Sequence, residues 1–338
     1  MVDTLVATNL IQKHWARKLW LEIPDRLWWA PYIGESENNV IQTKTELEKG
    51  QGDKITFGIA VELKGEGTEG DNKLEDSEEE LVTYDDAIFI DQLRNAVRLK
   101  GRMDEKKSAY DLRSTAKDRL KIWMPQTIDR HIFRQLSGET TYTFAGNTGV
   151  APDTNHIMYG GAATSKASLT TADTLTLALI DKAREWAEAE QTINMRPFMD
   201  KDDSPLWLLV IHPRQAYDLK GTTAYTQAAQ YAQERGKSNP LFTGALMAWN
   251  GVIIKSHPKV RLYTDYGSSS NVHAARALFL GAQAGCLAYG GGIIWEEKSF
   301  DYGNKHGFAT GRIFGVKKAR FNSEDYGVMT IDTAAAKP

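Results

Sequence analysis

The chain has 338 residues, of which 41% are hydrophobic, and its 41 Lys and Arg against 44 Asp and Glu give a formal net charge of −3. This near-neutral balance argues against a dedicated nucleic-acid reader, whose domains are usually strongly basic. The single cysteine excludes an internal disulfide and a cysteine-based zinc site, and no apolar run is long enough to span a membrane. A globular chain with a substantial core, in a reducing compartment, is therefore predicted.

Residues 1–50 are predicted to form a mixed arm. Residues 10–19 favour a short amphipathic helix, and Pro24 and Pro31 favour an extended segment after it. Four of the nine tryptophans fall within the first 29 residues, namely Trp15, Trp20, Trp28 and Trp29. Three alternatives stay open: the arm folds back on its own core, packs on a neighbouring subunit, or lies on a membrane surface, which would require more Lys and Arg on its polar face.

Residues 54–63 alternate between large apolar side chains and others, so one face of a strand carries all the large ones. These are Ile55, Phe57, Ile59, Val61 and Leu63. Burial of each would stabilise by about 1.5–3 kcal/mol, so another surface must cover this face. A return strand is predicted from Leu81 to about Leu99. Because an isolated two-stranded ribbon is marginal in water, a neighbouring copy is a natural support.

The segment between the two strands, residues 64–80, is strongly acidic. It contains eight Asp and Glu against two Lys, a net charge of −6, and cannot form a core. Either it is a solvated mobile tip, or it becomes ordered only against a basic partner surface. In the second alternative, Glu78, Glu79 and Glu80 dock on an adjacent copy. The candidate basic surfaces are the helix that follows the hairpin and the side chains of Arg98, Lys100, Arg102, Arg312, Lys317, Lys318 and Arg320.

A long helix is predicted between residues 104 and 137, where apolar residues recur at spacings of three and four. Such a helix would be about 45 Å long. Ser108 and Asp111 have capping-box spacing at its start, Pro125 should kink it, and Gly138 is placed to end it. Residues 139–170 are predicted to be loop.

Residues 171–300 mix helical and strand patterns, and residues 308–332 return to strand patterning. The run LWLLVI at 206–211 lies between two prolines, which predicts a buried strand. Further strands are predicted at 251–254 and 277–280. These later segments are therefore predicted to form a compact α/β or α+β domain that follows the long helix.

No constellation of catalytic, cofactor-binding or metal-ligating residues is apparent. The seven histidines lack the i, i+4 spacing of a zinc-binding helix, and His212 and His257, each followed by proline, are predicted to have turn roles. Cys286 suits a small buried hydrophobe. The glycines at 290–292 are not followed by the Lys-Ser/Thr of a phosphate-binding loop. These features favour a structural or interaction protein over an enzyme.

Six segments of the chain occur in a characteristic order: ITFGIAVELKGEGTEGD (55–71), IDQLRNAVRLKGRM (90–103), DRHIFRQLSG (129–138), WLLVIHPRQAYDLK (207–220), NGVIIKSHPKV (250–260) and FGVKKARFNSEDYGVMTIDTA (314–334). Their order, an arm, a long hairpin with a polar tip, a long helix, a mixed domain and return strands, resembles the major capsid proteins of tailed double-stranded DNA phages. Those proteins share the HK97-like fold, so the resemblance implies an α+β fold class for this chain. More specifically, the chain looks like the N4-like family.

The resemblance implies a division of the chain into four parts. Residues 1–50 would be an N-terminal arm, and residues 51–101 an extended hairpin loop that lies over a neighbouring subunit. Residues 102–170 together with 308–338 would form a peripheral domain around a spine helix. Residues 171–307 would form an axial domain.

The resemblance also implies a virion protein with no catalytic activity, cofactor or membrane partner. Copies would assemble as hexamers and pentamers, in the host bacterial cytoplasm, into an icosahedral shell around double-stranded DNA that is held without sequence specificity. A separate scaffolding protein is expected, because the arm reaches the hairpin within 50 residues, and a portal and a decoration protein are further expected partners. Lys64 and Lys73 do not complete a crosslinking motif, so no crosslink is predicted.

Two alternatives remain. One is an encapsulin-type nanocompartment of the same fold that holds an enzyme cargo, and the other is a soluble α/β enzyme with a site at strand ends such as His212 or His257. In the capsid interpretation, the residues predicted at contacts between subunits are Trp15, Trp20, Trp28, Trp29, Ile55, Phe57, Ile59, Val61, Glu78, Glu79, Glu80, Arg98, Lys100, Arg102, Lys317, Lys318 and Arg320.

Overall fold

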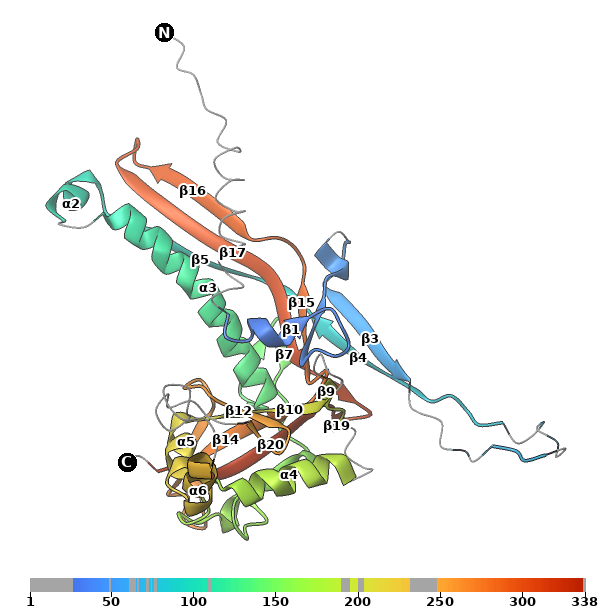
Figure 1. Cartoon of the computed structure of the whole chain (residues 1–338). Coiled ribbons are helices and arrows are strands. Elements are labelled where there is room, and N and C mark those ends of the chain that lie inside the picture. Colours follow the sequence, from blue (N-terminus) through green and yellow to red (C-terminus); the bar gives the residue numbers. More distant parts are fainter. Residues whose placement is uncertain are drawn as a thin grey trace.

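The computed structural model describes residues 27–48, 50–60, 65, 67–70, 73, 75, 78–108, 111–189, 195–199, 204–231 and 248–336. The helix predicted at 10–19 and the side chains of Trp15, Trp20 and Val61 lie outside these residues. Figure 1 shows three parts: a rounded end that carries several helices, an elongated sheet that lies along helix α3 (Leu112–Leu136), and a hairpin that projects away from both.

The long helix α3 begins later than predicted, because the chain breaks before it. Ser108 adopts an extended conformation and ends a short separate helix, α2 (Arg102–Lys107). Asp111 then caps α3, since its Oδ1 accepts hydrogen bonds from the backbone N–H groups of Arg113 and Ser114 at 3.0 and 3.3 Å. The prediction of one helix from residue 104 is therefore wrong, although Asp111 has the capping role that was expected of it.

The end of α3 agrees with the sequence. Gly138 lies just beyond it with a φ of +67°, and a Cβ atom there would collide with the carbonyl oxygen of Val150. The helix continues through Pro125 as one element. The loop predicted at 139–170 contains only short elements, among them the strand pair β6 (Thr143–Phe144) and β7 (Asn147–Thr148).

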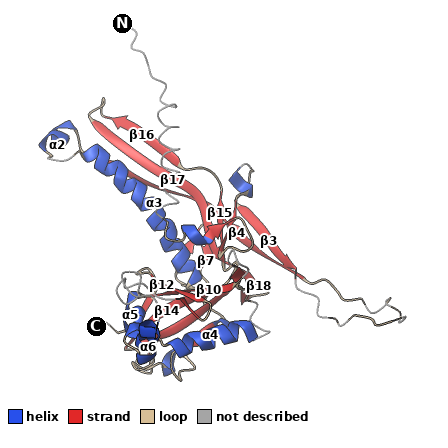
Figure 2. Ribbon diagram, viewed as in Figure 1, coloured by secondary structure: helices blue, strands red, loops and turns tan. Residues whose placement is uncertain are grey.

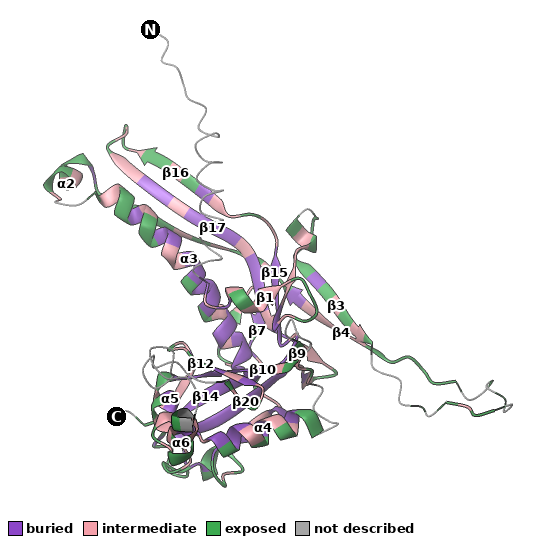
Figure 3. Cartoon of the chain, viewed as in Figure 1, coloured by how far each residue is buried: buried purple, intermediate pink, exposed green. Residues whose placement is uncertain are grey.

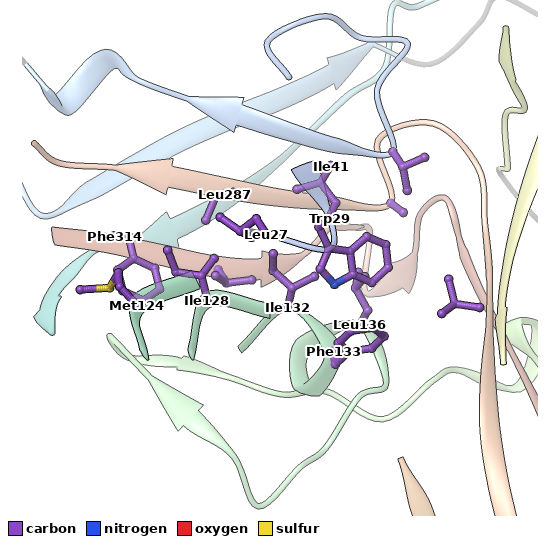
Figure 4. Close-up of a cluster of buried hydrophobic side chains, with 14 of the residues drawn as sticks. Leu27, Trp29, Ile41, Met124, Ile128, Ile132, Phe133, Leu136, Leu287 and Phe314 are labelled. Atoms are coloured by element: carbon purple, nitrogen blue, oxygen red, sulfur yellow. The ribbon is translucent and has the colours of Figure 1, made fainter. Parts of the chain in front are cut away.

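A six-stranded peripheral sheet packs along α3. Its strands are β1 (Ile33–Gly34), β2 (Ile41–Lys44), β15 (Gly285–Tyr289), β17 (Lys305–Lys318) and β16 (Ile294–Phe300) in that order, with β5 (Asp91–Arg98) also paired to β17. Figure 4 shows Met124, Ile128 and Ile132 of α3 directed toward Phe314 of β17 and Leu287 of β15. The apolar stripe predicted for the helix is therefore the face that meets this sheet.

An eight-stranded mixed sheet forms the centre of the rounded end. Its strands are β11 (Ala248–Trp249), β12 (Val252–Ser256), β10 (Pro205–Ile211), β14 (Val272–Leu280), β20 (Val328–Ala334) and β8 (Ile157–Tyr159), with β13 (Leu262–Tyr266) paired to β14 and β9 (Phe198–Met199) paired to β10. The helices of this end are α4 (Leu177–Ala189), α5 (Pro213–Lys220) and α6 (Thr223–Tyr231), as Figure 2 shows.

The predicted buried strand at 206–211 is confirmed as β10, and both of its faces are covered. Leu208 and Val210 point into the core that contains α3, whereas Trp207, Leu209 and Ile211 point into the core beneath the helices of the rounded end. Side chains alternate between the faces of a strand, so a continuous apolar run is what a strand between two cores requires.

The strand pairing corrects the predicted domain boundaries. The predicted axial range, 171–307, includes β15 and β16, but both strands pair with β17 in the peripheral sheet. The predicted peripheral ranges include β8 and β20, which pair with each other in the mixed sheet of the rounded end, where β20 also pairs with β14. Local patterns identified several of these strands without showing which partner each would have.

The projecting hairpin is formed by β3 (Lys54–Ala60) and β4 (Thr83–Phe89), which pair antiparallel from Lys54 opposite Phe89 to Ala60 opposite Thr83. After Ile90 the chain leaves the hairpin, and β5 joins the peripheral sheet instead. The predicted single return strand from residue 81 to 99 is therefore two strands with different partners. Figure 3 shows that exposed residues predominate along the outer part of the hairpin.

Four single turns of 3-10 helix and one more strand pair complete the described chain. They are η1 (Ala30–Tyr32), η2 (Glu46–Glu48), η3 (Thr154–His156), η4 (Lys166–Ser168), β18 (Arg320–Phe321) and β19 (Glu324–Asp325).

Candidate assembly surfaces

The root of the hairpin rests on its own chain. Ile55 of β3 and Ile88 of β4 are buried in a small cluster with Cys286 and Ala288 of β15. Phe57 packs edge-on against Phe321, with ring centroids 5.9 Å apart. Intramolecular burial therefore covers this part of the apolar face, which corrects the prediction that Ile55 is a contact between subunits.

Polar contacts fix the hairpin to the peripheral sheet at the same place. Lys317 of β17 forms an ion pair with Asp86 of β4 and donates a hydrogen bond to the carbonyl oxygen of Ala87 at 2.9 Å. The other carboxylate oxygen of Asp86 accepts from the backbone N–H of Arg320 at 3.3 Å. Lys317 was predicted to bind the acidic tip of a neighbour, but it holds the hairpin of its own subunit.

Lys318 also pairs with a residue of its own chain. Its ammonium group lies 2.6 Å from Asp325 Oδ2, and both side chains are almost fully buried. Burial lowers the pKa of Lys318, while the Asp325 carboxylate opposes that shift. The guanidinium of Arg320 binds the other oxygen of Asp325 at 3.0 Å. The prediction that Lys318 and Arg320 face a neighbour is therefore corrected for Lys318, and the Arg320 guanidinium already has an internal partner.

Two of the arm tryptophans pack on the core of their own chain. Trp29 is 0% exposed and packs against Phe133 of α3 at a centroid distance of 5.0 Å. Trp28 stacks edge-on against Trp29 at 4.7 Å, and its backbone N–H donates to Asp129 at 3.2 Å. For these two residues the arm folds back on its own core. The prediction that Trp29 contacts another subunit is therefore wrong, whereas Trp28 is only half-buried and its contact with a neighbour stays a prediction.

The outer part of the hairpin presents acidic and apolar groups to solvent. Glu78, Glu79 and Glu80 are all exposed, and Glu79 accepts a hydrogen bond from the backbone N–H of Gly65 at 2.7 Å. The next two residues, Leu81 and Val82, are 61% and 41% exposed. Leu81 was predicted to begin a strand rather than to belong to an exposed apolar pair, although its position directly after an acidic run indicates exposure. We name residues 78–82 the hairpin tip segment.

A basic surface lies at the other end of the subunit. Arg98 at the end of β5, Lys100 and Arg102 are all exposed, and Figure 1 shows this end, beside α2, on the far side of the body from the hairpin. The internal interactions of these cations are weak. Lys100 forms a long ion pair with Asp104 at 3.7 Å, and the Arg98 guanidinium makes a cation–π contact with the ring of Phe300.

Apolar side chains accompany these cations. Met103 is 66% exposed, and Tyr302, in the turn between β16 and β17, is fully exposed. The backbone N–H of Arg102 donates to Asn304 at 3.4 Å, which joins α2 to that turn. We name Arg98, Lys100, Arg102, Met103 and Tyr302 the basic end. It combines positive charge with apolar area, as the hairpin tip segment combines negative charge with apolar area.

The residues considered for catalysis have structural partners. His212 Nδ1 accepts a hydrogen bond from the backbone N–H of Arg214 at the start of α5, and His257 Nδ1 accepts from that of Lys259, both at 3.1 Å. The predicted turn roles are thus confirmed. Burial lowers the pKa of His257 to about 4, which keeps it neutral at pH 7. Burial also raises the pKa of the Cys286 thiol to about 12.

The part of the chain that the structure describes contains no group of three or more His, Cys, Asp and Glu placed to hold a metal ion. Within that same part, no helix is both long and apolar enough to cross a membrane.

A family model, a related protein sequence and solved structures all match this chain to the same class of protein. The family described as phage capsid protein matches residues 4–337. The major capsid protein of Pseudomonas phage KPP25 is 29% identical, over 97% of this chain and 96% of that protein. The capsid of Ralstonia phage GP4 has a TM-score of 0.81 and 39% identity, over 91% of this chain and 90% of that one. The capsid of cyanophage Pam1 has a TM-score of 0.81 and 23% identity, over 100% of both.

The architecture is that of a shell-forming structural subunit, with an elongated sheet along a spine helix, a rounded α/β end and a projecting hairpin. The similarity to these capsid structures confirms the predicted HK97-like α+β fold. The chain belongs to the phage capsid protein family. It is a structural protein of the phage virion that associates with copies of itself to form the capsid shell. The narrower resemblance to the N4-like family stays a prediction.

Proposed function

We propose that copies of this chain associate head to tail, with the hairpin tip segment of one subunit on the basic end of the next. The observation that supports this arrangement is the presence of opposite charge, each beside exposed apolar side chains, at opposite ends of one subunit. An interface between two different surfaces of identical subunits closes into rings when the rotation allows it. Such rings would be the hexamers and pentamers of an icosahedral shell.

Charged and apolar side chains would contribute differently to the free energy of association. Exposed ion pairs contribute about 0–1 kcal/mol each, so Glu78, Glu80 and their partners would set approach and register more than affinity. Burial of Leu81 and Val82 against Met103 and Tyr302 would supply more of the association free energy. Contacts that are individually weak suit a shell, because every subunit makes several of them at once.

We further propose that the shell encloses double-stranded DNA and holds it without sequence specificity. A net charge of −3 supports this, since it does not suggest a sequence reader. A separate scaffolding protein, a portal and a decoration protein remain predicted partners, and assembly is predicted in the host bacterial cytoplasm. The role is structural rather than catalytic. The relatedness to phage capsids favours a phage shell over an encapsulin-type compartment.

The combined variant Glu78→Gln, Glu79→Gln and Glu80→Gln tests the head-to-tail contact. It should raise the subunit concentration needed for assembly about fivefold, because each interface loses about 1 kcal/mol. It should also flatten the dependence of assembly on salt, since the screened charges are gone. Light scattering during assembly over a series of salt concentrations measures both effects.

The matched control replaces three exposed glutamates away from the hairpin, Glu35→Gln, Glu37→Gln and Glu185→Gln. This control changes the net charge equally and should assemble like the original chain. Unchanged assembly and salt dependence in the hairpin variant would exclude docking through its acidic groups.

A further inference from the structure

A second basic surface lies where α3 meets the rounded end, well away from the basic end. It is a groove of about 340 Å³ between the C-terminal half of α3 and the connection from β12 to β13. Lys259 joins the two walls, because its ammonium group donates a hydrogen bond to the carbonyl oxygen of Gln126 at 2.8 Å. The lining residues are Arg130, Arg134, Pro258, Lys259, Val260, Arg261 and Leu262.

Four of these seven lining residues are cationic, and none is acidic. Two carboxylates lie behind them. Glu139 binds Arg261 at 2.7 Å and lies 3.5 Å from Arg134, and Asp129 lies 3.6 Å from Lys259. Four cations against two carboxylates leave an excess of two positive charges at the groove.

The carboxylates orient these cations without covering them. The side chains of Arg134, Arg261 and Lys259 remain 37%, 32% and 27% exposed. Arg130 is exposed, and among the residues that the structure describes no carboxylate or other acceptor pairs with its side chain. Because Glu139 and Asp129 leave part of each cationic side chain exposed, the groove presents guanidinium and ammonium N–H donors to solvent.

We propose that this groove binds phosphate groups of duplex DNA enclosed by the shell, an inference that rests on the DNA-filled shell proposed above. Guanidinium groups match phosphate oxygens with paired hydrogen bonds. Contacts to phosphate oxygens carry no sequence information directly, so the contact would be independent of sequence. Few phosphate contacts give weak binding, which suits DNA that must be packed and later released.

The composition of the groove also argues against other occupants. A segment of protein, such as the acidic tip of another copy, would be expected to find an aromatic anchor at the centre of its site. Single-stranded nucleic acid would be expected to stack on aromatic rings. None of the seven lining residues is aromatic, whereas the basic end does offer an exposed Tyr302 to a protein partner.

The test is fluorescence anisotropy of short labelled duplexes of two unrelated sequences, titrated with the unassembled full-length chain over a range of salt concentrations. The double variant Arg130→Gln and Arg134→Gln should weaken binding to both duplexes about tenfold and lower the slope of log affinity against log salt by about 2. The single variant Arg130→Gln, which removes no hydrogen bond or ion pair of the described residues, should show about half of each effect on a logarithmic scale.

The matched control is Arg119→Gln with Lys182→Gln, which removes two exposed cations outside the groove and should leave affinity and slope nearly unchanged. Equal losses in control and groove variants would overturn the proposal, because they would show only a response to net charge. Unchanged DNA binding together with failed assembly of the groove variants would assign the groove to a neighbouring subunit and also overturn it. Groove variants that bind DNA normally and still form shells would reject this inference while leaving the proposed shell function intact.

Discussion

Replacing Asp332 by alanine is expected to lower the free energy of unfolding by about 3–5 kcal/mol. Asp332 of β20 is 0% exposed and binds the guanidinium of Arg276 with two hydrogen bonds, of 2.8 and 2.7 Å. It also accepts the hydroxyl of Tyr266 at 2.5 Å. Removal of the carboxylate leaves Arg276 as an unpaired charge in a nearly water-free site, which is why the expected loss is large.

The same cluster connects the two halves of the subunit. Arg276 also donates to the carbonyl oxygen of Ser137, at the C-terminal end of α3, at 3.0 Å. Urea unfolding of the unassembled chain measures the loss, and Asp265→Ala is the matched control. Asp265 pairs with Lys166 at the surface, where both side chains are about half exposed, so the control should lose at most about 1 kcal/mol. Losses of equal size would mean that burial of the Asp332 pair has no special energetic role.

Trp29→Ala should lower the free energy of unfolding by about 3–5 kcal/mol, through the cavity that it leaves between α3 and the peripheral sheet. Figure 4 shows the Trp29 indole directed toward α3, among Leu27, Ile132 and Phe133. No hydrogen-bond partner within the described residues reaches its indole nitrogen, so the truncation would remove packing rather than a polar contact.

Thermal and urea unfolding, followed by tryptophan-independent circular dichroism, measure this effect. Tyr302→Ala is the control, because its side chain is fully exposed and should change stability by less than about 0.5 kcal/mol. If Trp29→Ala proved as mild as the control, the arm would contribute little to the core of its own subunit, and its role between subunits would have to be reconsidered.

Local sequence patterns predicted those parts of the fold that local physics determines. The alternation from Lys54 gives strand β3, the LWLLVI run gives β10, and Gly138 ends α3 at the expected place. Partner choice between distant strands could not be predicted in this way. The pattern of residues 285–300 is compatible with either sheet, and its pairing with β17 depends on the path of the whole chain.

Local patterns also failed to predict the partners of several residues that were expected at contacts between subunits. A lysine on a strand can face solvent, a neighbour or a buried carboxylate, and composition alone does not distinguish these environments. Lys317 and Lys318 are adjacent in β17, so they must point to opposite faces of the sheet, and this spacing already indicates that both could not join one external surface. Trp29 lies in the core and Trp28 packs against it, since large aromatic side chains near a long apolar helix have an internal surface to cover.

The most direct test of self-assembly is the mass of the purified full-length chain by light scattering, with negative-stain microscopy of the same fraction. We expect rings of five or six subunits or closed shells, at salt concentrations that leave charge contacts unscreened. A uniform 37.8 kDa monomer at high concentration, unchanged when a candidate scaffolding protein is added, would contradict assembly through surfaces of this chain.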